Sequence, residues 1–171
     1  TYTQALNSKG GIEADFTVTQ ISDKCFLIIT GTAFAHHDSG WLKKLRRENG
    51  FEDVEIKDVT ETLATFGIWG PKSREILQSL TTADLSNESF PFMHSQEIEI
   101  DGVKLRATRI TYVGELGWEL YIPIENASTI WEKLFAAGAF PCGYRAIESL
   151  RLEKGYLAWA GEINTEYNPY E

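Results

Sequence analysis

The chain has little cysteine and no long apolar run. Its 171 residues include two cysteines, Cys25 and Cys142, and a single methionine. Two distant cysteines provide neither a disulfide framework nor metal-ligand spacing, which favours a reducing compartment. No apolar run approaches the roughly 20 residues of a transmembrane helix, and the N-terminus lacks a signal-peptide pattern. Because Cys25 begins an apolar segment, we expect it to lie in the core.

Basic residues are also few. Sixteen lysines and arginines stand against 25 acidic residues, for a net charge of -9. An acidic surface argues against nonspecific nucleic-acid binding and against docking on anionic lipid. The one basic cluster, at 43–47, falls in a helical pattern and is interpreted as a solvated helix face. We therefore expect neither a nucleic-acid nor a membrane partner.

Several chemical signatures are absent. The sequence has no glycine-rich phosphate loop, no dinucleotide fingerprint, no nucleophile elbow and no cysteine–histidine signature. The run His36-His37-Asp38 could indicate a metal or a proton relay, but adjacent residues on a helix do not share a face. We interpret the run as polar residues at a helix start and predict no metal site, with a metal as the minor alternative.

What the chain does contain is material for a core, with 43% hydrophobic and 12% aromatic residues. Strict alternation predicts a half-buried strand over 12–21. Further strands are expected at 25–30, 54–59, 63–69, 97–100 and 103–106, the last two joined by an Asp-Gly turn. Helices are expected at about 38–48, from Pro71, from Asn126 and at 144–154. Hairpins mixed with crossover helices predict an α+β fold of antiparallel sheets with flanking helices.

The segment 111–121, TYVGELGWELY, reads as a tight hairpin with its turn at 115–116. This register places Tyr112 opposite Glu119. Directly opposed residues lie roughly 5 Å apart and point to the same face, so a phenol and a carboxylate would project together. Such a pair could clamp a flat, hydrogen-bonding heterocycle. The alternative is an ordinary hairpin with an exposed acid.

Asp15 lies on the polar face of the predicted strand 12–21. A carboxylate beside an amine or iminium stabilises positive charge and can orient or accept a proton. The alternative is an exposed strand residue without a chemical role.

Five segments together resemble the aminomethyltransferase (glycine-cleavage T-protein) superfamily, in the family's order and over the whole chain. They are NSKGGIEAD at 7–15, FGIWGPKSR at 66–74, YVGELGWE at 112–119, SLRLEKGY at 149–156, and EIN with NPYE within 162–171. Tyr156 and Trp159 resemble the branch formed by the folate domains of dimethylglycine and sarcosine dehydrogenases and oxidases. Ile147 stands where stand-alone aminomethyltransferases usually carry an arginine, and the cysteine of the iron–sulfur-assembly relatives is absent.

The resemblance implies tetrahydrofolate as the cofactor. Asp15 would be the catalytic residue beside the reacting folate nitrogen, while Tyr112, Glu119 and Asn7 would be cofactor-binding residues. In the family an amine-bound one-carbon unit passes to tetrahydrofolate, giving 5,10-methylenetetrahydrofolate. The implied partners are a methylated amine donor and a flavin-containing domain or subunit, with no flavin site in this chain.

We expect residues 1–171 to form a single folate-binding domain and a portion of a longer protein, because the chain starts without methionine and family members extend on both sides. The expected location is cytoplasmic, or the mitochondrial matrix in a eukaryote. The alternatives to a transfer enzyme are a noncatalytic folate- or pterin-binding module and an interaction domain of a larger oxidoreductase.

Overall fold

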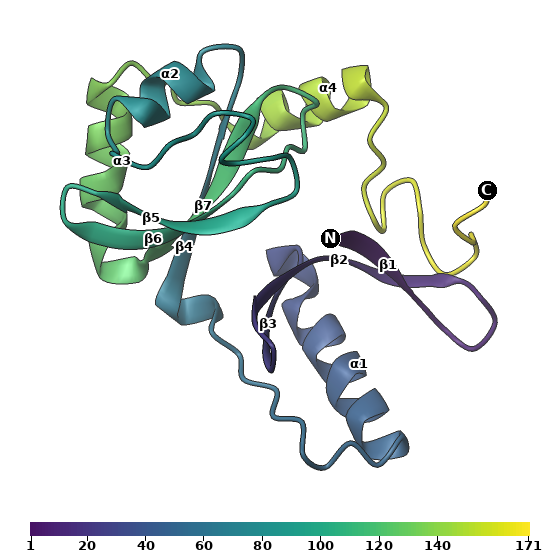
Figure 1. Cartoon of the computed structure of the whole chain (residues 1–171). Helices are drawn as coiled ribbons and strands as arrows, with labels where there is room; N and C mark the ends of the chain where they lie inside the picture. The colour runs from purple at the N-terminus through teal and green to yellow at the C-terminus, as the bar shows by residue number, and fades with distance from the viewer. The chain divides into compact units, whose positions relative to one another are not determined.

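The computed structural model describes residues 1–171 (Figure 1), and the chain divides into two compact units. Unit 1 comprises residues 1–58 and 157–171, and unit 2 comprises residues 59–156. Each unit contains one antiparallel sheet together with helices, so the predicted α+β class is confirmed. No helix is both long enough and apolar enough to cross a bilayer.

Unit 1 is built on a three-stranded antiparallel sheet in the order β1-β2-β3. The strands are β1 (Tyr2–Leu6), β2 (Ile12–Ser22) and β3 (Cys25–Ile29), followed by a 3-10 turn η1 (Thr32–Phe34) and by α1 (Ala35–Glu48). The alternation in β2 has the predicted effect, since Ile12, Ala14 and Phe16 are all buried. Phe16 contacts Trp41 of α1, with 6.5 Å between ring centroids.

Three features of residues 1–59 differ from what the sequence predicts. β1 was not predicted, because its stability comes from pairing with β2 rather than from its own pattern. Residues 54–59 were predicted as a strand but form none, since no neighbouring strand supplies a ladder. Cys25 was expected in the core and is exposed, because it pairs with Ser22 at the turn where the sheet ends.

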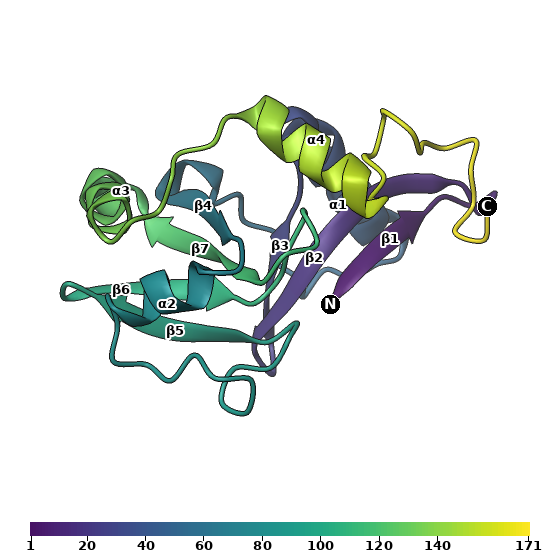
Figure 2. The same cartoon turned by 90° about the horizontal axis from the view of Figure 1, so that it is seen from above.

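Unit 2 contains a four-stranded antiparallel sheet in the order β4-β7-β6-β5, which can be followed in Figure 2. Its strands are β4 (Leu63–Trp69), β5 (Ser95–Ile100), β6 (Val103–Thr108) and β7 (Gly117–Pro123), and its helices are α2 (Ser73–Gln78), α3 (Ala127–Ala136) and α4 (Tyr144–Lys154). Short 3-10 turns, η2 (Thr60–Thr62) and η3 (Ile124–Asn126), precede β4 and α3. The Asp-Gly hairpin forms as predicted, with both Asp101 and Gly102 at positive φ.

The core of unit 2 lies on one face of its sheet. Trp118, Leu120 and Ile122 alternate along β7 and are fully buried there. Leu77 of α2 and Ile130 of α3 belong to the same apolar cluster, so these two helices cover that face. Because successive residues of a strand point to opposite faces, the residues between them on β7 point to the other face.

Candidate functional site

Glu119 and Tyr121 lie on the face of β7 that is opposite to this core. In the ladder, Glu119 pairs with Gly67 of β4 on one side and with Thr108 of β6 on the other. The lack of a side chain at Gly67 leaves room for the Trp69 indole, since a Cβ there would come within 2.3 Å of its ring. The face therefore presents a carboxylate bordered by an indole and a phenol.

The predicted hairpin register is wrong. Glu119 pairs with Thr108 and not with Tyr112, and residues 109–116 form a loop between β6 and β7. The carbonyl of Leu116 explains the departure, because it accepts hydrogen bonds from the Gly70 amide and the Ser73 hydroxyl, each at 2.8 Å. These bonds draw the end of the loop toward the β4–α2 connection, so it cannot continue a ladder with residues 109–113.

Glu119 is a partly buried carboxylate with one defined partner. The Tyr121 hydroxyl donates a hydrogen bond of 2.6 Å to Glu119 Oε2. Burial raises the pKa of Glu119, and the bond from Tyr121 lowers it in part. The pKa of Tyr121 is itself raised, by burial and by the neighbouring carboxylate, so the phenol remains a proton donor.

Tyr112 is supported by the end of α4. Its ring stacks on Tyr156, with 6.4 Å between centroids and 20° between planes. The backbone carbonyl of Tyr156 accepts a 2.9 Å hydrogen bond from Arg151, which is only 3% exposed and also pairs with Glu148. Arg151 was not predicted as part of the site, because helical spacing alone describes it as one charge of a solvated face.

Asp15 lies in unit 1, on β2 opposite Gln4 of β1. The Tyr2 hydroxyl donates a hydrogen bond of 3.0 Å to Asp15 Oδ2. The pKa of Asp15 is raised, mainly by burial and further by the charge of Asp38, while the bond from Tyr2 opposes the rise. A raised pKa moves the carboxyl toward the range in which it can exchange protons near neutral pH.

Asn7 organises the turn between β1 and β2. Its Oδ1 accepts hydrogen bonds from the amides of Lys9 at 2.9 Å and Gly11 at 3.1 Å, and its Nδ2 donates to Glu13 at 3.3 Å. A Cβ on Gly11 would lie 2.1 Å from the Thr165 carbonyl oxygen, so the motif also needs glycine for close backbone approach. A binding role for Asn7 stays a prediction.

His37 links α1 to β2. Its Nδ1 lies 2.8 Å from Asp38 Oδ1, and its Nε2 lies 3.2 Å from Glu13 Oε1. Asp38 is 2% exposed and also accepts a hydrogen bond from Thr30. The His36-His37-Asp38 run does lie in the first turns of α1, as interpreted, but the pairing with Glu13 was not visible in the sequence. The structure contains no group of three or more side chains able to hold a metal.

His37→Gln should lower the melting temperature by about 1–3 °C near pH 6, a value typical of surface ion pairs. The pKa of His37 is raised, chiefly by the hydrogen bond to Asp38. Because the pKa is higher in the folded state, the protonated His37 imidazole contributes its full stability below about pH 6.5, the pKa of an unfolded histidine. This contribution is lost as the pH rises through the pKa of His37 in the folded protein. The difference from the wild type should therefore be smallest near pH 9.

Thermal melts at several pH values would measure this, with His36→Gln as the matched control. A difference between His37→Gln and the wild type that does not change with pH would contradict the ionic role of His37.

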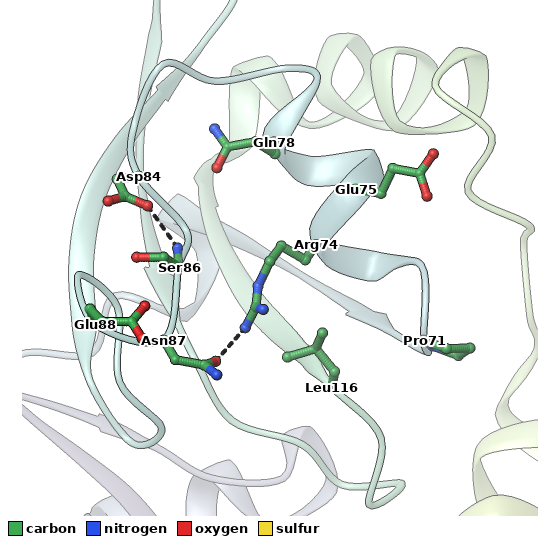
Figure 3. A pocket seen from close by; sticks show the side chains of 9 residues that line it. All are labelled: Pro71, Arg74, Glu75, Gln78, Asp84, Ser86, Asn87, Glu88 and Leu116. Atoms are coloured by element: carbon green, nitrogen blue, oxygen red, sulfur yellow. Dashed lines mark hydrogen bonds between the residues drawn. The ribbon is translucent and has the colours of Figure 1, made fainter.

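A separate hollow lies on unit 2 beside α2 (Figure 3). Arg74 in this hollow donates a 2.6 Å hydrogen bond to Asn87 Oδ1. Three carboxylates also line it, from Glu75, Asp84 and Glu88. None of the predicted site residues borders the hollow, so it is distinct from the candidate site.

The predicted site residues are thus distributed over both units. Asp15 and Asn7 belong to unit 1, where both are tied to the β1–β2 region. Tyr112 and Glu119 belong to unit 2, on the β6–β7 loop and on β7.

Comparison with known proteins places the chain in a family. The profile described as GCVT N-terminal domain matches residues 1–171. The mitochondrial dimethylglycine dehydrogenase of Mus musculus is 39% identical over 97% of this chain and 19% of its own length. The mitochondrial sarcosine dehydrogenase of Mus musculus is 36% identical over 99% of this chain and 20% of its own. The aminomethyltransferase of Caldanaerobacter subterraneus is 36% identical over 99% of this chain and 46% of its own.

A solved structure gives the same result. The glycine cleavage system aminomethyltransferase T from Bartonella henselae superposes with a TM-score of 0.78 at 26% identity, covering 98% of this chain and 44% of that one. The chain spans about one fifth of the length of the two dehydrogenases and less than half of the aminomethyltransferase. The predicted resemblance is confirmed, and the chain belongs to the aminomethyltransferase family as a GCVT N-terminal domain related to part of the dimethylglycine and sarcosine dehydrogenases.

Proposed function

We propose that this chain is a tetrahydrofolate-binding, one-carbon (aminomethyl) transfer domain resembling the folate domain of the dimethylglycine and sarcosine oxidoreductases. The observation that carries the proposal is the partly buried Glu119 carboxylate, which is held by Tyr121 on one face of a β-sheet. A reduced pterin presents a ring N–H and an amino group side by side. Ionised carboxylates form strong, short hydrogen bonds with such donors, and two parallel bonds also fix the orientation of the ring.

Tyr112 and Asn7 are the other proposed folate-binding residues. Tyr112, held by its stacking on Tyr156, would provide an aromatic surface beside the pterin. Asn7 would act at the β1–β2 turn, which its own side chain shapes. All 171 residues would work as a single folate-binding domain composed of the two compact units.

Asp15 is the proposed catalytic residue. Bound tetrahydrofolate supplies the nitrogen that accepts the one-carbon unit. The Asp15 carboxylate would stabilise the positive charge of the incoming iminium and accept a proton, while Tyr2 holds its Oδ2. Its raised pKa supports a role in proton transfer near neutral pH.

The donor would be a methylated amine oxidised by a flavin-containing domain or subunit. This proposal is supported by the relatives, two of which are named as dehydrogenases of dimethylglycine and sarcosine. The proposed location is cytoplasmic, or the mitochondrial matrix in a eukaryote. The second option is supported by those relatives, which are described as mitochondrial.

Titration calorimetry of this chain with tetrahydrofolate should show one binding site per chain. Saturating ligand should also raise the melting temperature, because a ligand at 100 times its Kd adds about 2.7 kcal/mol to the free energy of unfolding. If the chain shows neither binding nor a thermal shift, the folate function is excluded and an interaction domain is favoured. Binding without any one-carbon transfer would instead favour a noncatalytic folate-binding module.

A further inference from the structure

Tyr121 is a buried tyrosine whose hydroxyl donates its hydrogen bond to Glu119. It lies two residues after Glu119 on β7, so both side chains project from the same face of the sheet. Tyr121 is 2% exposed, and its hydroxyl donates to Glu119 Oε2 at 2.6 Å. A phenol has one proton to donate and an ionised carboxylate can only accept, so the direction of this bond is settled.

The neighbouring strand supports Tyr121 in this position. Arg106 of β6 pairs directly with Tyr121, and Thr108 pairs with Glu119. Thr108 is buried, contacts the Tyr121 hydroxyl, and donates a hydrogen bond of 2.9 Å to Ser95 of β5. A row of polar groups thus runs across β5, β6 and β7 and ends at the carboxylate.

The two carboxylate oxygens of Glu119 have different surroundings. Oε2 is held by Tyr121, which leaves Oε1 as the oxygen that a ligand can use. Anchoring one oxygen fixes the plane of the carboxylate before any ligand arrives, which removes an ordering cost from binding. The same bond favours the ionised form of Glu119 and so opposes the rise in its pKa that burial causes.

We propose that Tyr121 is the positioning residue of Glu119, holding one carboxylate oxygen so that the other is directed to the N–H donors of a reduced pterin. This inference rests on the proposed folate function and deepens it. It differs from a packing role, in which the Tyr121 ring would matter and its hydroxyl would not.

Tyr121→Phe separates the two roles, because it removes the hydroxyl and keeps the ring. Tetrahydrofolate affinity should fall about tenfold near pH 8, the loss expected for one hydrogen bond to a charged group. It should fall further near pH 6, because loss of the bond raises the pKa of Glu119 and leaves less of the ionised acceptor. Tyr170→Phe, at a fully exposed tyrosine, is the matched control and should bind like the wild type at both pH values.

Two further measurements guard against a folding artefact. Carbon-detected NMR titration should show a higher pKa for Glu119 in folded Tyr121→Phe than in the wild type. The double variant with Glu119→Gln should bind no more weakly than Glu119→Gln alone, because Tyr121 acts through that carboxylate.

The outcomes are distinguishable. If the wild type binds tetrahydrofolate and Tyr121→Phe binds equally well at both pH values, the positioning role is overturned and the folate function stands. Additive losses in the double variant would also overturn it, since Tyr121 would then act independently of Glu119. If the wild type does not bind, both the folate function and the positioning role fall.

Discussion

Glu119→Gln should weaken tetrahydrofolate binding by roughly 30-fold or more. A hydrogen bond to a charged group typically contributes about 1.5–3 kcal/mol, and each 1.4 kcal/mol is about a tenfold change in affinity. The glutamine keeps the volume of the side chain but exchanges one acceptor oxygen for a donor, which would face the N–H groups of the pterin. Calorimetric titration of the variant measures the loss directly.

Glu115→Gln is the matched control, because Glu115 is an exposed acid in the loop that precedes β7. It removes the same charge from the same unit and should leave the affinity unchanged. Wild-type affinity in Glu119→Gln would exclude Glu119 from the site. A similar loss in both variants would show that the effect is a general one of net charge.

Asp15→Asn should lower the rate of one-carbon transfer by about 100-fold to 10,000-fold, the usual contribution of a positioned acid or base. Folate affinity should change by less than about threefold, since the carboxylate acts on the charge that develops during transfer rather than on the bound ring. The measurement is 5,10-methylenetetrahydrofolate formed in single turnovers. A flavin-dependent dehydrogenase added to the assay oxidises dimethylglycine by two electrons to the iminium, and transfer of its methylene group to tetrahydrofolate releases sarcosine.

Asp23→Asn serves as the control for Asp15, because Asp23 is an exposed acid in the turn that follows β2. It should transfer and bind like the wild type. Equal losses of transfer and binding in Asp15→Asn would make Asp15 a binding residue only.

Much of the fold could be predicted because its signals are local. The alternation of β2 and the Asp-Gly turn between β5 and β6 each describe one element without reference to distant residues. The predicted helix at 144–154 coincides with α4 for the same reason. The strand predicted at 54–59 failed because a strand needs a partner, and whether a partner is available is not a local property.

The candidate site was only partly predictable. The motifs identified Asp15, Tyr112, Glu119 and Asn7 as candidates, and their roles stay predictions. The register placed Tyr112 opposite Glu119 and was wrong, because hydrogen bonds to Leu116 from the distant β4–α2 connection shape that loop.

The sequence by itself determined the α+β class, the family and the candidate residues, because periodicity, turn chemistry and motif order are all written along the chain. Only the tertiary structure decided which groups meet: Tyr121 with Glu119, Tyr156 with Tyr112, and Glu13 with His37. Tyr112 and Tyr156 are far apart in the chain, and so are His37 and Glu13. The environment of Glu119 depends on the neighbouring strands β4 and β6. Their geometry follows from packing and ladder register, which no single segment specifies.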